Sequence, residues 1–189
     1  MVEQALGDAG SARDVVHANR VIRLGREQQP ALFQQLRAAE LDLLRATIPA
    51  GVELHRQTAA NVPNVLADPA QMHQVLVNLC TNAWQSLAGE PGRIEVHLDS
   101  IHVGPDEARP GSDLPPGTYA RLTVTDTGQG MPPEVQERIF EPFFTTKAPG
   151  QGTGLGLPVV HGIIKDHQGS ISVSSSVGKG SVFTIHLPA

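Results

Sequence analysis

Two asparagines four residues apart are the first side chains whose spacing could do chemistry. Asn78 and Asn82 flank the sequence Leu-Cys-Thr. In a helix, residues four apart project from one face, so both carboxamides would point the same way. Apolar residues around them could pack the neighbouring face on a sheet: Val75, Leu76, Leu79 and Ala83. Such a pair suits a hydrated cation with oxygen ligands, such as Mg²⁺ on a nucleotide. The same spacing fits a polar pair that is satisfied by local hydrogen bonds.

A carboxylate followed by glycines forms a second candidate site. Asp126 begins the run Asp-Thr-Gly-Gln-Gly-Met, which ends at Met131 and follows an alternating apolar stretch. A carboxylate at the end of a strand accepts hydrogen bonds and can recognise an exocyclic amino group such as that of adenine. Gly128 and Gly130 would let the backbone adopt positive φ and approach a ligand closely. An ordinary Asp-Gly turn between a strand and a helix would show the same residues.

Glycine occupies every second position from Gly150 to Gly156, in the run GQGTGLGL. One turn does not require four glycines, and this segment opens a helix with an apolar face. Backbone N–H groups together with a helix N-terminus form an anion site that suits phosphates. The run is neither a P-loop, since no Gly-Lys-Ser/Thr follows, nor the dinucleotide motif GxGxxG. A flexible linker is the alternative, but a linker would favour serine and would lack the apolar face.

Three of the chain's five phenylalanines lie just before these glycines, in the run FEPFFTTK of residues 140–147. In an irregular segment, such residues are typical of the hinge of a lid that closes on a ligand. They fit equally well a surface loop that is pinned by a small hydrophobic cluster.

Composition narrows the class of protein. The chain has 189 residues, of which 40% are hydrophobic and 17% charged, so one ordinary domain with a short appendage can fold. A formal charge of -5 provides no basic footprint for nucleic acid. The single cysteine, Cys80, excludes an intrachain disulfide and a cysteine-based zinc site, and it indicates a reducing compartment. No apolar run approaches the ~20 residues that span a bilayer, and we expect no membrane segment.

The pattern of apolar and turn residues predicts an α+β sandwich. Asp68 can cap a helix that runs from Pro69 to about residue 87. Further helices are expected at residues 133–139 and 155–167 and, near the N-terminus, at 12–29 and in a segment that includes residues 36–44. Strands are expected at residues 32–33, 52–55, 93–103, 119–125, 170–175 and 181–187. Helices and strands mix without regular alternation, which argues against a doubly wound fold.

These segments, in this order, resemble the ATPase domain of two-component sensor histidine kinases, in the GHKL superfamily. Residues 78–83 resemble its N box, 126–130 its first glycine box, 140–147 its F box and 150–157 its second glycine box. Residues 178–181 are similar to its closing segment, and the resemblance covers roughly residues 61–188.

The resemblance implies a Bergerat fold, a two-layer sandwich with a mixed sheet backed by helices, and binding of ATP or ADP with Mg²⁺. It assigns Asn82 and Asn78 to Mg²⁺ and the phosphates, and Asp126 to the adenine amino group. Lys147 could approach the γ-phosphate, which makes Asn78, Asn82 and Lys147 the expected catalytic residues. The remaining expected nucleotide contacts are Gly128, Gly130, Met131, Phe140, Gly152, Thr153, Gly154, Leu155 and Gly156.

In the family, the γ-phosphoryl group passes to a histidine on a separate helical hairpin and then to an aspartate of a response regulator. Residues 1–29 resemble the end of that dimerisation hairpin, and residues 30–189 the catalytic domain. His17 is not followed by an acidic residue and a nearby proline, so we expect the acceptor histidine to be missing and no autophosphorylation. We expect the cytoplasmic part of a kinase, with its own hairpin and a response regulator as partners, no nucleic acid, and a possible homodimer through the N-terminal helix.

One departure from the family concerns Trp84 and Gln85, since many members carry a basic residue near position 85. A phosphate contact from that position is therefore in doubt, and Trp84 emission is expected to respond to nucleotide. Three alternatives remain: a gyrase-, mismatch-repair- or chaperone-type ATPase, an anti-sigma-factor serine kinase, and a non-catalytic regulatory module. The first commonly carries a carboxylate where this chain has Asn78.

Overall fold

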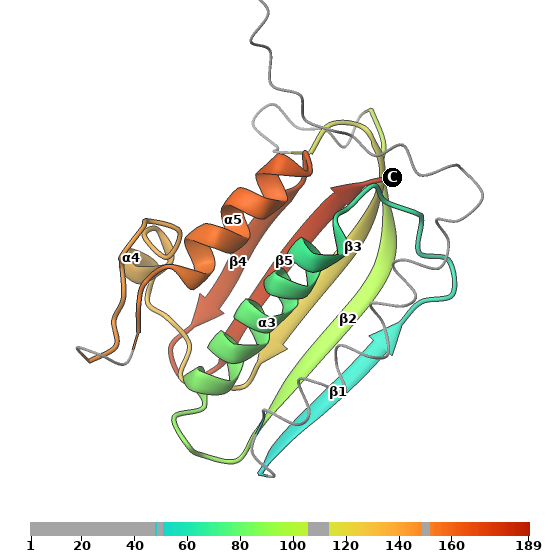
Figure 1. Cartoon of the computed structure of the whole chain (residues 1–189). Coiled ribbons are helices and arrows are strands. Elements are labelled where there is room, and N and C mark those ends of the chain that lie inside the picture. The colour runs from blue at the N-terminus through green and yellow to red at the C-terminus, as the bar shows by residue number, and fades with distance from the viewer. Residues whose placement is uncertain (1–47, 49–50, 106–113, 149–151) are drawn as a thin grey trace, which may run out of the picture.

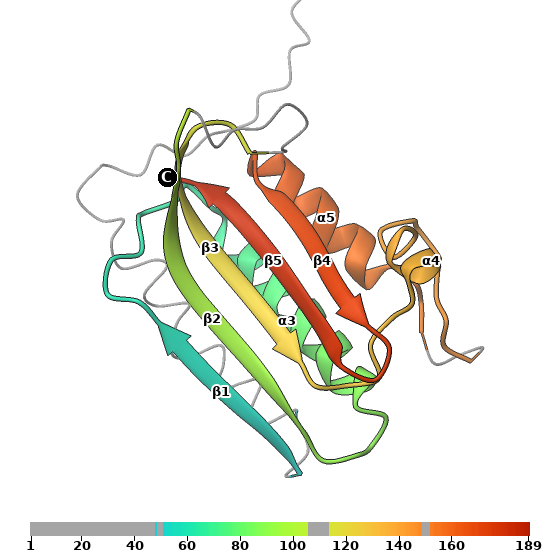
Figure 2. The ribbon, with the colours of Figure 1, turned by 180° about the vertical axis from the view of Figure 1, so that it is seen from behind.

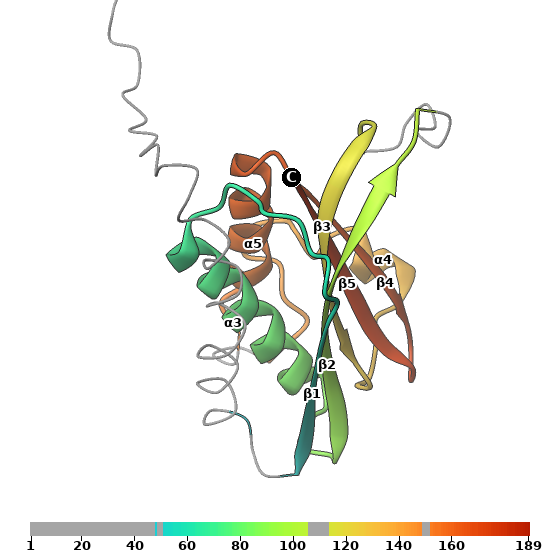
Figure 3. The same ribbon diagram turned by 90° about the vertical axis from the view of Figure 1, so that its right-hand side faces the viewer.

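The computed structural model describes residues 48, 51–105, 114–148 and 152–189, which form two layers. One layer is a five-stranded sheet, and the other contains helices α3 and α5, which cover one face of it (Figure 1 and Figure 3). The arrangement confirms the predicted α+β sandwich. The elements predicted within residues 12–29 and 32–44 lie outside the described residues.

The sheet is mixed, and the last strand in the sequence lies inside it. The order is β1-β2-β3-β5-β4. The bounds are β1 Val52–Thr58, β2 Gly92–Val103, β3 Gly117–Asp126, β4 Ser170–Ser176 and β5 Gly180–Pro188. β1 runs parallel to β2, whereas the other neighbours are antiparallel. β1 extends beyond the predicted end at residue 55, because its pairing with β2 continues to Thr58 opposite Leu98.

Alternate residues of the central strands face the helices and build the core between the two layers. The buried positions on these strands include Ile94, Val96, Leu98, Leu122, Val124, Phe183, Ile185 and Leu187. The apolar face predicted for the asparagine-bearing helix packs against them, with Leu79 and Cys80 fully buried. This packing fixes the rotation of that helix about its axis.

Helix α3, Pro69–Ser86, begins as its sequence predicts. Asp68 Oδ1 accepts hydrogen bonds from the N–H groups of Ala70 (2.8 Å) and Gln71 (3.1 Å), and Pro69 occupies the first helical position. The Asp68 N–H also donates to His167 Nε2 at 3.0 Å. This bond ties the start of α3 to the end of α5.

The remaining helices are α4, Pro133–Gln136, and α5, Gly156–Asp166. α4 is shorter than the predicted 133–139, because the N–H of Arg138 donates to Val135 O, only three residues back. The Gln136 side chain then holds this segment on β4 through the backbone of Ser175. Among the described residues, no helix is both long and apolar enough to span a membrane.

The face of the sheet opposite α3 and α5 carries neither helix (Figure 2). It bears polar side chains, of which Arg121 and Asp99 form an ion pair with Nε donating to Oδ1 at 2.8 Å. The hydrogen bond from Arg121 lowers the pKa of Asp99. The pocket described next lies on the other side of the sheet.

Candidate functional site

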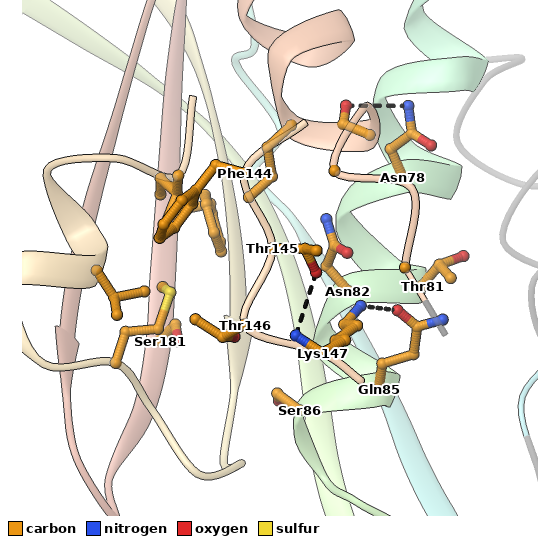
Figure 4. A pocket seen from close by; sticks show the side chains of 18 of the residues that line it. Asn78, Thr81, Asn82, Gln85, Ser86, Phe144, Thr145, Thr146, Lys147 and Ser181 are labelled. Carbon is orange, nitrogen blue, oxygen red and sulfur yellow. Dashed lines mark hydrogen bonds between the residues drawn. The ribbon is translucent and has the colours of Figure 1, made fainter. Parts of the chain in front are cut away.

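A pocket of about 620 Å³ opens between α3, the end of β3, the residues around Phe144 and the start of α5. Its volume is within the range of ligand sites in proteins. Figure 4 shows the polar side chains that α3 directs into it. All four motifs predicted from the sequence contribute residues to this one cavity.

Helix α3 lines the pocket with a stripe of carboxamides, Asn78, Asn82 and Gln85. Their spacing of four and three residues puts them along one helical face. Asn78 Nδ2 donates to Gly156 O at 3.4 Å, at the first residue of α5. Among the described residues, the Asn82 side chain has no hydrogen-bond partner, so its oxygen and its nitrogen are available to a ligand.

Trp84 does not belong to this stripe, although it is close to Asn82 in sequence. Successive helical residues differ by about 100° in direction, and Trp84 packs against the hydrophobic core. It is not among the residues that line the pocket. Its side chain therefore lies away from the pocket, and the response of its emission to nucleotide stays a prediction.

Asp126 closes β3 and is buried in the pocket wall with 3% of its surface exposed. Its Oδ1 accepts hydrogen bonds from the Ser86 hydroxyl at 2.7 Å and from the Gly128 N–H at 2.8 Å. The described residues provide no partner for Oδ2. The carboxylate is thus held in place by one oxygen while the other can accept a bond from a ligand.

The two glycines after Asp126 serve different purposes. Gly130 has φ +67 and lies against Ser176, so both its conformation and its surroundings require glycine. Gly128 does not have the predicted positive φ. A Cβ atom there would lie 2.6 Å from the carbonyl oxygen of Ser86, so this glycine lets the loop pack on the end of α3.

The phenylalanine segment divides between the pocket and its outer side. Phe144 lines the pocket, and the Arg138 guanidinium lies 4.3 Å from its ring centroid. Phe140 does not line the pocket, because its ring packs on His161 with centroids 5.2 Å apart. Phe143 is 75% exposed and has φ +67.

Gly152 and Gly154 of the second glycine-rich segment pack closely against the phenylalanine segment. Gly154 has φ +64, and a Cβ atom there would lie 2.7 Å from Phe143 Cα. Phe143 N–H also donates to Gly154 O at 2.9 Å. Gly152, Thr153 and Gly156 line the pocket, whereas Leu155 does not and is 39% exposed. Gly150 lies outside the described residues.

Lys147 extends from the phenylalanine segment to α3. Its Nζ donates a hydrogen bond to Gln85 Oε1, and its backbone N–H donates to Thr145 Oγ1 at 3.2 Å (Figure 4). Burial lowers the pKa of its ammonium group. Among the described residues that line the pocket, Lys147 is the one basic side chain and Asp126 the one acidic side chain.

Of the thirteen residues predicted to contact a ligand, the pocket gathers all except Gly128, Phe140 and Leu155. It also contains residues that were not among these predicted contacts, including Thr81, Gln85 and Ser86 on α3. The helical spacing from Asn78 and Asn82 could have found these three. Thr145, Thr146 and Ser181 lie in segments that the sequence singled out but were not themselves predicted as contacts, whereas Phe183 lies outside those segments and reaches the pocket through the fold.

Comparison with known proteins shows to which family this chain belongs. Residues 67–189 match the family model described as histidine kinase-, DNA gyrase B-, and HSP90-like ATPase. Sensor kinase CckA of Brucella abortus is 43% identical over 146 residues, which are 77% of this chain and 15% of that protein. Sensor histidine kinase ZraS of Escherichia coli K12 is 41% identical over 138 residues, 72% of this chain and 26% of that protein. The chain therefore spans about a quarter or less of these two relatives.

Solved structures agree with the sequence matches. The catalytic domain of histidine kinase ThkA superposes with a TM-score of 0.61 at 30% identity, covering 84% of this chain and 91% of that one. The same kinase, solved in complex with response regulator protein TrrA, gives a TM-score of 0.58 at 26% identity and covers 84% of this chain and 40% of that one. The chain belongs to the family of histidine kinase-, DNA gyrase B- and HSP90-like ATPases, and it is the ATPase-type domain of a sensor histidine kinase.

Proposed function

We propose that this pocket binds Mg-ATP and that the chain is a protein-histidine kinase catalytic domain, which donates the γ-phosphoryl group to a histidine on a separate hairpin. The supporting observation is that the two ends of the pocket along α3 carry different groups. Ser86, near the end of the helix, holds the buried Asp126 carboxylate, whereas Asn78 contacts the first residue of α5. These two helix positions are about 12 Å apart along the axis. A ligand with a base at one end and phosphates at the other suits such a pocket.

At the Asp126 end, the free carboxylate oxygen would accept a hydrogen bond from the adenine amino group. The bonds from Ser86 and Gly128 keep the carboxylate oriented, so little freedom is lost on binding. Gly130 and Met131 line the same end of the pocket. This orientation favours a base that has an amino group over one that presents an acceptor there.

At the other end, the start of α5 and the glycines before it would hold the phosphates. Backbone N–H groups at a helix N-terminus attract anions, and Gly154 and Gly156 line this end. Lys147 would add positive charge from the part of the pocket nearer Gln85. Thr153 lies in the same wall and could donate its hydroxyl.

The residues present fit a nucleotide-borne Mg²⁺. The Asn82 side chain is without a partner in the described part of the chain, and Asn78 has its carboxamide oxygen uncommitted. Mg²⁺ is commonly held by one or two protein oxygens together with waters and phosphates. When bound, the ion neutralises charge on the phosphates; Asn78 and Asn82 would hold it and fix the nucleotide beside α3.

The side chains that line the pocket favour phosphoryl transfer over hydrolysis. Transfer depends mainly on positioning and charge neutralisation, whereas hydrolysis also needs a group that activates water. Asp126 is the one carboxylate among the described pocket residues, and its Oδ1 is engaged by Ser86 and Gly128. Asn78 occupies the position where the hydrolytic members of the superfamily commonly carry a carboxylate.

The remaining expectations follow as parts of this proposal. Residues 1–29 would belong to the dimerisation hairpin and residues 30–189 to the catalytic domain. The phosphoryl group would pass to a response regulator, as the ThkA–TrrA complex suggests by its composition. ATP and such regulators are intracellular, so this part of the kinase would act in the cytoplasm.

Calorimetry with Mg-ATP tests the binding step. Replacing Asn82 by alanine should abolish Mg-dependent binding, because it removes the uncommitted amide from the centre of the α3 stripe. Gln74→Ala is the matched control, since Gln74 is exposed on the same helix and does not line the pocket. Equal affinity of wild type and Asn82→Ala would contradict the assignment.

Transfer requires a second experiment. Chain incubated with γ-labelled ATP should label a supplied acceptor hairpin with acid-labile, base-stable phosphate. The chain itself should remain unlabelled, and phosphohistidine on it would contradict that part of the proposal.

A further inference from the structure

Gln85 is the residue of α3 that meets the Lys147 ammonium. The two residues are 62 positions apart in sequence, and Nζ donates to Oε1. Gln85 lies on the same helical face as Asn82, one turn closer to the end of α3. Its neighbour Ser86 holds the Asp126 carboxylate. Lys147 therefore enters the pocket between the carboxylate and the uncommitted Asn82 amide.

Contacts restrict the backbone and the aliphatic part of Lys147 as well as its ammonium group. Its backbone N–H donates to Thr145 Oγ1 at 3.2 Å. A Cβ atom at Gly152 would lie 3.0 Å from Lys147 Cδ and 2.9 Å from Thr145 Oγ1. A larger residue at position 152 would thus compete with the lysine for space. A long side chain loses rotamer freedom when it is ordered. Contacts at both ends of the Lys147 side chain are therefore needed to fix the position of its ammonium group.

The described residues 143–148 and 152–156 are held to α3 by carboxamides at two places, Lys147 and Gly156. Asn78 Nδ2 donates to Gly156 O at 3.4 Å, and Gln85 Oε1 accepts from Lys147. Asn82 lies between them and has no side-chain partner among the described residues. The first contact fixes the start of α5, and the second fixes the one basic group that lines the described pocket.

We infer that Gln85 is a positioning residue that holds the Lys147 ammonium between the base end of the pocket and Asn82, within reach of the phosphates nearest the base, an inference that rests on the proposed ATP site. An ammonium has three N–H donors, so one bond to Gln85 leaves two for phosphate oxygens. A carboxamide accepts this bond without adding a negative charge that would repel phosphate. A cation at position 85 would repel Lys147, and the lysine of the phenylalanine segment supplies positive charge that the helix does not provide.

A double-mutant cycle on affinity tests this inference. Gln85→Met keeps the length of the side chain but removes the acceptor, and Lys147→Met removes the charge. We expect Gln85→Met to weaken Mg-ATP and Mg-ADP binding about tenfold, equivalent to about 1.4 kcal/mol, and to leave adenosine binding unchanged. In the Lys147→Met background, the same change at position 85 should have almost no effect, because its partner is gone.

Matched controls separate this role from a general loss of structure. Gln74→Met and Lys165→Met alter exposed residues of α3 and α5 outside the pocket and should bind all three ligands as wild type does. Gln85→Ala provides a second variant without an acceptor and should behave as Gln85→Met does. Circular dichroism checks that each variant is folded.

The results distinguish failure of the inference from failure of the proposed function. Equal losses for Mg-ATP, Mg-ADP and adenosine would show a structural role and overturn the inference. Additive effects of the two substitutions, or unchanged affinity in Gln85→Met, would overturn it as well. If the wild-type chain binds no nucleotide under these conditions, the proposed ATP site and the inference fail together.

Discussion

At the residue scale, the chemistry of the pocket depends on one carboxylate and one ammonium group among its described residues. Asp126 is held by donors from its own loop and from α3, whereas Lys147 is held by an acceptor. Asp126 can accept a hydrogen bond from a base, and Lys147 supplies positive charge that attracts phosphates. Both are placed by residues of the last turn of α3, Gln85 and Ser86.

The lowered pKa of Lys147 makes nucleotide affinity depend on pH. Burial lowers the pKa of the ammonium in the free protein, and bound phosphates should raise it again. Binding then takes up a proton once the pH exceeds the lowered pKa. Affinity for Mg-ATP should fall as pH rises from there, by up to about tenfold per pH unit. Calorimetry across alkaline pH measures this, and Lys147→Met should lack the decline that Lys165→Met retains.

Cys80 should impose a pH dependence on stability. Complete burial raises the pKa of its thiol to about 12, from 9.0. Above pH 9 the unfolded chain loses this proton while the folded chain keeps it, so the free energy of unfolding falls as pH rises. The slope should approach about 1.4 kcal/mol per pH unit. Urea unfolding of wild type and Cys80→Ala between pH 8 and pH 11 compares the two, and parallel curves would contradict the expectation.

At the scale of elements, two backbone positions hold the phenylalanine segment against the glycine-rich segment. Phe143 and Gly154 both have left-handed φ, and the N–H of the first donates to the carbonyl of the second. A non-glycine residue in this conformation is uncommon and costs energy, so the surrounding contacts must maintain it. The segment that carries Lys147 therefore has a defined course.

Gly154→Ala should impair binding more than folding. The added Cβ atom would collide with the backbone of Phe143 and displace the segment that carries Lys147. We expect Mg-ATP affinity to fall by more than about tenfold, which corresponds to about 1.4 kcal/mol. Gly178→Ala is the control: its φ is +77 but nothing lies within 4 Å of the new atom. It should cost about 1 kcal/mol of stability at constant affinity. Equal affinities in the two variants would refute this account.

At the scale of the whole molecule, the pocket joins parts of the chain that are far apart, and ligand binding should therefore stabilise the domain. At a free Mg-ATP concentration of about 100 times Kd, the free energy of unfolding should rise by about 2.7 kcal/mol. Thermal denaturation followed by circular dichroism measures this as a higher Tm. Asp126→Asn should show little or no rise, since the amide cannot both keep its donors and accept from the base. A full rise in that variant would argue against the assigned role of Asp126.

The fold was predictable where the signals are local. The Asp68 cap, the proline after it and the apolar stripe all belong to α3, so its start and its buried face could be predicted. The order of the four motifs likewise placed Asn82, Asp126 and Gly154 in one pocket. Local signals could not show that Gly128 serves packing against Ser86, or that Phe140 turns away to His161. These depend on contacts between distant segments, as does the meeting of Gln85 with Lys147.

The position of β5 also affects when this domain can first become functional during synthesis. β5 is the last strand of this sheet to be made, yet it pairs with both β3 and β4 and carries Ser181 and Phe183 into the pocket wall. Until residues 180–188 have left the ribosome, β3 and β4 lack the strand that joins them. A nascent chain that already carries all four motifs should therefore be unable to hold nucleotide. Competence should arise in a single late step, and chains stalled shortly before β5 emerges should remain susceptible to protease even in excess ATP.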